Sequence, residues 1–325
     1  MESWLHPGQY ARRLFFLNAG CAHDARDSVD RAYVERLRNL VDGLRAGVKL
    51  MLFAFDRTHD ERGEPDLAHS AFYVPDAYVR DIARAHPQSF EWVASIHPYA
   101  RDAVERLEQA KRDGARAVKW LPSAMGIDPA SPQCDRFYAS LSKNGIPLIS
   151  HGGEERAVLG RDAHDYGNPL RLRRALDAGV RVVIAHCSSL GSDRDLDHGP
   201  NGPYVDSFSL FIRIFQKYQN AYGDISAMTQ VNRAGPALVR LIEEQGWHAR
   251  LLNGSDYPLP GVMPLFSMQH FVSRKLLDEK AAPVLTEIRR HNPILFDFVL
   301  KRHLRSNGRS LSAAVFETRA FFEKS

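Results

Sequence analysis

Short apolar segments alternate with amphipathic helical segments along most of this chain, and this alternation constrains its fold more than any other feature. Most of the apolar segments are continuous rather than alternating, as expected for parallel strands that are covered on both faces. Helical periods over 102–114, 137–145 and 169–179 each end at a glycine before the next apolar segment. The expected strands are 47–56, 90–99, 115–123, 146–153, 180–189, 220–228 and 250–256.

A repeated strand–helix unit predicts an α/β protein with a parallel sheet. The TIM (β/α)8 barrel uses eight such units in about 250 residues, and seven are visible in these 325 residues. An open, doubly wound sheet is the alternative, because periodicity alone does not close a barrel. Its nucleotide-binding versions are disfavoured, since no glycine-rich dinucleotide turn and no GK[ST] loop follows any strand.

We expect one barrel domain over residues 1–325, with a helical tail from about 293 to 325. The segments 6–20 and 27–44 have the pattern of a loop and a helix that would follow a first strand. The Pro- and Gly-rich stretch 188–204 is too long for an ordinary connection, so we interpret it as a substrate loop or lid.

Composition and charge exclude several classes of protein. The 43 Lys and Arg residues exceed the 39 Asp and Glu residues by only four, and they gather modestly at 301–309, so a nucleic-acid partner is not expected. No apolar run reaches the roughly 18 residues of a membrane span. The cysteines, Cys21, Cys134 and Cys187, are few and far apart, which favours the reducing cytoplasm over a disulfide framework. The expected partner is a small-molecule substrate, and the sequence leaves a homo-oligomer open.

Polar side chains stand at the expected carboxyl ends of five strands, where a parallel barrel places its chemistry. Each has an ordinary structural explanation: a histidine can cap a strand, a lysine beside a tryptophan can extend to solvent, and an aspartate can brace a turn. Their recurrence at one end of the sheet favours a common site. The five residues are Lys119, His151, His186, Asp224 and Asp256.

Imidazole and carboxylate groups suit zinc and related divalent ions, and a catalytic site keeps one position open for water. Zinc is the ion that we expect, with manganese as the alternative. Asp256 would serve as a ligand and as the general base for the bound water. Gly152 and Gly153, directly after His151, would leave room beside the ion.

At these residues the sequence resembles the amidohydrolase superfamily, specifically the amidohydrolase 2 branch of metal-dependent hydrolases and non-oxidative decarboxylases. The resemblance covers roughly residues 90–300 in consistent order. Its motifs are "VKWLPSAMGIDP", "PLISHGG", "VVIAHCSSLG", "YGDISA", "NGSDYPLP" and "HNPILFDF".

The resemblance implies that His151 is the fifth-strand metal ligand and that Asp256 is the eighth-strand ligand and base. It implies that His186 either binds a second metal ion or acts on water or substrate. Lys119 would be carboxylated between two ions, which requires a neutral amine, or would contact substrate in a site with one ion. The implied function is hydrolysis of a small carboxylated or cyclic substrate by metal-bound hydroxide, and the alternative is non-oxidative decarboxylation.

Residues beside the strand ends are expected to line the substrate pocket. They are Trp120, Met125, Glu154, Glu155 and Cys187. The two glutamates are equally compatible with the solvated first turn of a helix, where negative charge is favourable.

One departure from the family pattern is serious: the first strand of the family carries a His-x-His pair, and no such pair occurs in this chain. The visible units would then be strands two to eight, and a catalytically silent barrel with a binding role is an alternative function. We expect an upstream extension that contains an apolar run ending in His-x-His. Without it, His23 or His97 would have to complete the site, while His6 lies in an unsuitable context. A serine hydrolase is disfavoured, because no G-x-S-x-G elbow is present.

Overall fold

The computed structural model describes residues 7–45, 47–70, 72–155, 158 and 163–323. Two compact units make up the chain, and each unit is assembled from three segments. The first unit comprises Met1–Val48, Ser226–Gly246 and Gly254–Ser312. The second unit comprises Lys49–Ile225, Trp247–Asn253 and Ala313–Ser325.

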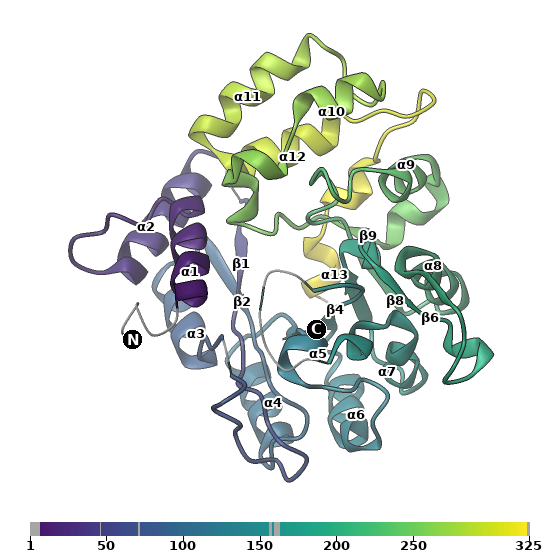
Figure 1. The fold of residues 1–325 in the computed structure, drawn as a ribbon. Coiled ribbons are helices and arrows are strands. Elements are labelled where there is room, and N and C mark those ends of the chain that lie inside the picture. Colours follow the sequence, from purple (N-terminus) through teal and green to yellow (C-terminus); the bar gives the residue numbers. More distant parts are fainter. Residues whose placement is uncertain (1–6, 46, 71, 156–157, 159–162, 324–325) are drawn as a thin grey trace. The chain divides into compact units, whose positions relative to one another are not determined.

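The second unit contains seven parallel strands that follow one another in chain order (Figure 1). β1 pairs with β2, and β3, β4, β5, β8 and β9 form a second run. A parallel bridge between Ala94 and Val118 connects the two runs. The strands are β1 (Leu50–Phe53), β2 (Phe90–Val93), β3 (Val118–Trp120), β4 (Leu148–His151), β5 (Val182–Ala185), β8 (Ala221–Asp224) and β9 (Leu251–Leu252).

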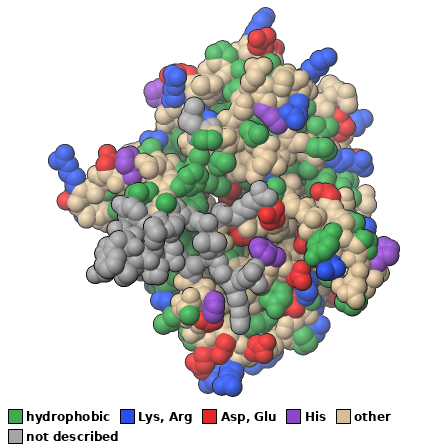
Figure 2. Space-filling view, in the orientation of Figure 1, with side chains coloured by type: hydrophobic (Ala, Val, Ile, Leu, Met, Phe, Trp, Pro, Cys, Tyr) green, Lys and Arg blue, Asp and Glu red, His purple; other side chains and the backbone are tan. Residues whose placement is uncertain are grey.

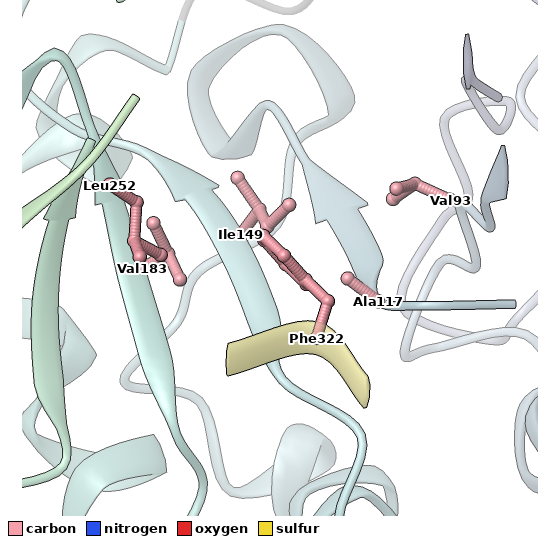
Figure 3. Packing of buried hydrophobic residues seen from close by; sticks show 6 residues of the cluster. All are labelled: Val93, Ala117, Ile149, Val183, Leu252 and Phe322. Atoms are coloured by element: carbon pink, nitrogen blue, oxygen red, sulfur yellow. The ribbon is translucent and has the colours of Figure 1, made fainter. Parts of the chain in front are cut away.

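One hydrophobic cluster collects side chains from all seven strand positions. Figure 3 shows its buried members, Val93, Ala117, Ile149, Val183, Leu252 and Phe322. Its members include Met51 and Phe53 of β1, at one end of the strand order, and Leu252 of β9, at the other end. Side chains of the first and last strands can share one cluster only if the sheet curls around a common interior, as in a barrel. The remaining members are Val93, Ala117, Ile149, Val183, Tyr222, Phe321 and Phe322.

Helices between the strands supply the outer layer of the second unit. Two of them show why the sequence ends or begins a helix there: α6 ends at Gly145 in a left-handed conformation, and Asp206 caps the N-terminus of α8. These helices are α3 (Asp76–Ala85), α4 (Ala103–Arg112), α5 (Pro122–Met125), α6 (Asp135–Asn144), α7 (Arg173–Asp177) and α8 (Ser207–Lys217), and a further helix, α13 (Arg319–Glu323), follows the last strand.

The described part of the first unit is helical. Ser28 caps α2 and Asn292 caps α12, each by accepting a hydrogen bond from a backbone N–H of the first turn. The helices are α1 (Pro7–Ala19), α2 (Val29–Asp42), α9 (Pro236–Glu243), α10 (Met268–Ser273), α11 (Ala281–His291) and α12 (Pro293–His303).

The parallel α/β architecture and the seven strand positions confirm the fold predicted from the sequence. Three segments differ from the prediction. Residues 7–19 form a helix rather than a loop, and the stretch 188–204 contributes to an antiparallel hairpin, β6 (Ser192–Arg194) with β7 (Tyr204–Asp206). Residues 313–323 form a short 3-10 turn and a five-residue helix instead of one long helix.

The surface agrees with the small net charge. Basic and acidic side chains are interspersed over the face shown in Figure 2. Among the described residues, no helix combines the length and the apolar character that crossing a membrane requires.

Candidate functional site

Strand alternation decides which of the predicted site residues face the interior of the second unit. Successive side chains of a strand point to opposite faces, so residues two apart share a face. Ala117, Ile149 and Tyr222 belong to the interior cluster. Lys119, His151 and Asp224 therefore face the same interior, at the carboxyl ends of β3, β4 and β8.

His151 and His186 lie side by side at the ends of adjacent strands. β4 pairs with β5 so that His151 stands opposite Ala185, and His186 follows directly. The two imidazole rings are 5.3 Å apart between centroids and meet edge to face at 70°. Nε2 of His151 is 3.3 Å from a carboxylate oxygen of Glu155. Two imidazoles and one carboxylate are thus gathered in a buried place.

The turn that carries His186 has an unusual backbone. His186, Cys187 and Ser188 have φ values of +54°, +48° and +48°, in the left-handed region that non-glycine residues rarely occupy. The Cys187 thiol donates to the Asp224 carbonyl oxygen at 3.4 Å, and the side chain is fully buried. Such strained turns are concentrated at functional sites, where the surrounding packing holds them.

The glycines after His151 make room for this turn. A Cβ added to Gly152 would overlap the Ser188 hydroxyl and lie 3.0 Å from Ile184 Cγ2. Gly153 has a φ of +78°, and an added Cβ would lie 2.6 Å from the Leu190 carbonyl oxygen. The side chains of Ser188 and Ile184 therefore account for Gly152, and the 188–190 backbone accounts for Gly153, whereas the sequence suggested that the two glycines leave space beside an ion.

Lys119 and Trp120 point to opposite faces of β3. Lys119 is 6% exposed, and its Nζ lies 6.0 Å from the centroid of the Phe53 ring. The Trp120 indole is fully buried, stacks on Phe137 at 5.7 Å and donates its N–H to the Ile96 carbonyl oxygen. These contacts are those of a core residue, and a role for Trp120 in substrate binding stays a prediction.

The two glutamates after His151 have different surroundings. Glu155 contacts His151, and its other carboxylate oxygen accepts the Val158 N–H at 3.0 Å. Glu154 is fixed through its backbone, since its N–H donates to the Leu190 carbonyl oxygen at 2.9 Å. The carboxylate of Glu155 therefore contacts one of the two imidazoles, that of His151.

Asp256 belongs to the first unit, so the structure does not test its predicted meeting with His151 and His186. Its φ of +55° lies in the left-handed region, and its carbonyl oxygen accepts the Leu259 N–H at 3.0 Å. An aspartate in this conformation, in the loop that follows a buried strand, is consistent with a functional role. Its function as ligand and base stays a prediction.

A buried polar network that the sequence analysis missed follows β1 and β2. Asp56 accepts the His97 backbone N–H at 2.8 Å and pairs with Arg106 at 2.9 Å. Nε2 of His97 bonds to the Met125 carbonyl oxygen at 3.0 Å, and Nδ1 lies 3.3 Å from the Tyr99 N–H. The only sequence signal for this network was the position of Asp56 and His97 at strand ends.

Burial lowers the pKa of His97 to about 3, and the neighbouring His59 ring, 4.8 Å away, acts in the same direction. The ring is therefore neutral at physiological pH. Because both of its nitrogens already have partners, His97 is poorly placed to replace a missing metal ligand. His23 is exposed in the first unit, and His6 lies outside the described residues.

The donor types at the strand ends fit a zinc-class ion, since adjacent imidazoles and a carboxylate are its preferred nitrogen and oxygen ligands. The fit is partial. Within the described ranges, no group of three or more His, Cys, Asp or Glu side chains is gathered closely enough to hold a metal ion. At the carboxyl ends of β4 and β5, His151 and His186 provide two imidazole donors side by side.

A solved structure with a TM-score above 0.5 has the same fold. An uncharacterised TIM-barrel protein from Bordetella bronchiseptica is 17% identical, with 90% of this chain and 92% of that chain covered, at a TM-score of 0.53. A Pseudomonas putida protein provisionally described as a 2-pyrone-4,6-dicarboxylic acid hydrolase is 15% identical over 87% of this chain and 99% of that chain, at 0.44. A 2,6-dihydroxybenzoate decarboxylase is 15% identical, with 55% of this chain and 64% of that chain covered, at a TM-score of 0.37. Because the last two scores lie below 0.5, we draw nothing from them.

No curated protein matches the chain. The amidohydrolase family does match, over residues 26–294. That range contains every strand of the sheet and all the strand-end residues discussed above. The chain therefore belongs to the amidohydrolase family.

Proposed function

We propose that this chain is a metal-dependent hydrolase that acts on a small carboxylated or cyclic substrate at the carboxyl ends of its strands. The observation that carries the proposal is the buried pair of imidazoles, His151 and His186, whose rings are 5.3 Å apart at the ends of adjacent strands. Membership of the amidohydrolase family supports an enzyme of hydrolase type. It also leaves the related decarboxylase chemistry as an outcome to be tested.

His151 and His186 are the residues that would hold a divalent ion, together with Asp256 as the predicted further ligand. When bound, such an ion polarises a substrate carbonyl and lowers the pKa of its water ligand. We assign the remaining steps to side chains of this chain. The Asp256 carboxylate accepts the proton of the attacking water, and an N–H of His186 donates to the oxygen on which negative charge develops. Lys119, on the same interior face, either contacts the substrate or becomes carboxylated.

The test begins with the metal content of protein purified without chelator. We expect zinc or manganese in the wild type and a large loss of occupancy in His151→Ala and Asp256→Ala, because removing one ligand from a small set greatly weakens binding. His303→Ala is the matched control, since His303 is an exposed histidine of helix α12. Full occupancy in His151→Ala and Asp256→Ala would refute the assignment.

The reaction type is then distinguished on a panel of small cyclic esters, amides and aromatic carboxylates. Ring opening or amide cleavage that depends on the added metal supports the hydrolase. Release of CO2 without hydrolysis would replace it by a decarboxylase. Stoichiometric metal with no turnover of any panel member would favour a binding protein.

A further inference from the structure

Helix α12 of the first unit contains an ion pair that is buried almost completely. Nζ of Lys301 lies 2.6 Å from a carboxylate oxygen of Asp297, one helical turn away, and each residue is 1% exposed. Removing two charges from water carries a desolvation penalty that often exceeds their attraction, and apolar residues of similar size are commonly as stable or more stable. Stability alone therefore does not explain the pair.

Both members of the pair also bind loops that follow strands. Lys301 donates a second hydrogen bond, 2.7 Å long, to the carbonyl oxygen of Gly254. The other carboxylate oxygen of Asp297 lies 3.3 Å from the Thr229 hydroxyl, which donates to it. Gly254 stands two residues before Asp256, and Thr229 stands five residues after Asp224. The pair thus connects α12 to the segments that come after β8 and β9.

The segment that Lys301 holds includes a strained residue. Asp256 has a φ of +55°, in the left-handed region, which costs free energy for a residue with a Cβ, although aspartate adopts it more readily than most. Contacts with the surrounding chain help to hold such a conformation. The carbonyl of Gly254 fixes the orientation of the peptide plane between residues 254 and 255, directly upstream of Asp256. The ammonium group of lysine suits this task, because it can donate to a carboxylate and to a carbonyl at the same time.

We propose that Asp297 and Lys301 are positioning residues, which hold residues 254–256 in the conformation that presents the Asp256 carboxylate. The pair does not touch the reacting groups; it acts through the Gly254 carbonyl. The consequence for metal binding rests on the proposed function, since it requires Asp256 to be a ligand. The consequence for the backbone does not.

The decisive variant is the double substitution Lys301→Met with Asp297→Leu, which removes both charges together and leaves neither one buried alone. We expect its thermal midpoint to stay within a few degrees of wild type. We expect hydrogen exchange at the amides of Tyr257 and Leu259 to become at least tenfold faster, because both donate hydrogen bonds inside the released segment. A matched control is Arg290→Met with Glu287→Leu, an exposed pair on α11, which should leave these amides unchanged.

Titration with Zn²⁺ alone provides the second readout. We expect the dissociation constant for Zn²⁺ to rise at least tenfold in the double variant, and not in the control. Unchanged exchange at Tyr257 and Leu259 in a folded double variant would overturn the positioning role. Faster exchange together with unchanged Zn²⁺ affinity in both the double variant and Asp256→Ala would instead overturn Asp256 as a ligand, while leaving the backbone role in place.

Discussion

At the scale of single residues, the buried imidazole of His97 makes the free energy of unfolding of the second unit depend on pH in the acid range. Its pKa is lowered to about 3, chiefly by burial, whereas a histidine in the unfolded chain has a value near 6.5. Between these values the unfolded chain binds a proton that the folded chain does not. The stability contribution of the neutral ring is therefore present above about pH 6.5 and is lost as the pH falls towards 3.

We predict that His97→Gln flattens this acid dependence. As the pH falls from about 6.5 towards 3, the free energy of unfolding of the wild type should decrease by on the order of a few kcal/mol because of this residue. Urea unfolding at pH 7, 5 and 4 measures the difference, with His23→Gln as the exposed control. Asp76 has the opposite effect on the pH dependence. Burial raises its pKa to about 6, so its contribution to the free energy of unfolding is lost as the pH rises through 6. An unchanged slope in His97→Gln would contradict the prediction.

The contact between Gly152 and Ser188 yields a second prediction at this scale. Gly152→Ala forces a methyl group against the Ser188 hydroxyl and Ile184, in a core that cannot yield easily. We expect a loss of roughly 1–3 kcal/mol in the free energy of unfolding. Ser188→Ala in the same chain should restore part of that loss, because it removes the overlapping oxygen.

A double-mutant cycle measures this coupling, and Gly246→Ala is the control, since a Cβ there has open space. Additive effects of Gly152→Ala and Ser188→Ala would show that the added methyl group does not clash with the Ser188 hydroxyl. The hydroxyl of Ser188 is buried and has no hydrogen-bond partner among the described residues, so its removal alone should cost little.

At the scale of elements, strands were easier to predict than the segments between them. All seven strands fall within the predicted ranges, because continuous apolar runs bounded by glycine have few other solutions in a parallel sheet. The hairpin of β6 and β7 was missed, since its strands are short and largely polar and the segment between them contains Gly and Pro. No local sequence pattern predicts a strand pairing of this kind.

The C-terminal segment shows how tertiary contacts override a helical pattern. Residues 310–322 read as one helix, yet the backbone N–H of Asn253 donates to the Val315 carbonyl oxygen at 2.9 Å, next to the end of β9. This contact uses a carbonyl that a continuous helix would need. α13 then begins after the interruption and directs Phe322 into the interior cluster (Figure 3).

We predict that Phe322→Ala is strongly destabilising although only three residues of the sequence follow it. The ring is 6% exposed and packs in the cluster that all seven strand positions share. Truncating a buried phenylalanine costs about 3–5 kcal/mol in the free energy of unfolding. Thermal or urea unfolding tests this, with the 40%-exposed Phe298→Ala as the control. Equal effects of the two substitutions would argue against an interior role for α13.

At the scale of the whole molecule, the order of the strand-end residues could be predicted from the sequence, but their assembly could not. Alternation along β3, β4 and β8 brings Lys119, His151 and Asp224 to one interior face, which follows from period-two geometry alone. The left-handed turn of His186 and the packing of Gly152 depend on contacts between segments far apart in the chain. Sequence patterns carry no information on such contacts.

Metal binding should therefore be visible in the stability of the complete chain. A ligand that binds only the folded state stabilises it by an amount set by its concentration relative to its dissociation constant, about 2.7 kcal/mol at a hundredfold excess. For a chain of this size we expect the thermal midpoint of metal-free protein to rise by roughly several degrees on adding Zn²⁺ or Mn²⁺. Chelator should reverse the shift, and Mg²⁺, which prefers oxygen ligands, should produce little of it.

In His151→Ala the shift should be largely lost, while in His303→Ala it should persist. If neither Zn²⁺ nor Mn²⁺ moves the midpoint of the wild-type chain at millimolar concentration, the adjacent imidazoles of His151 and His186 do not form a metal site in this protein, and their burial serves the packing of β4 against β5.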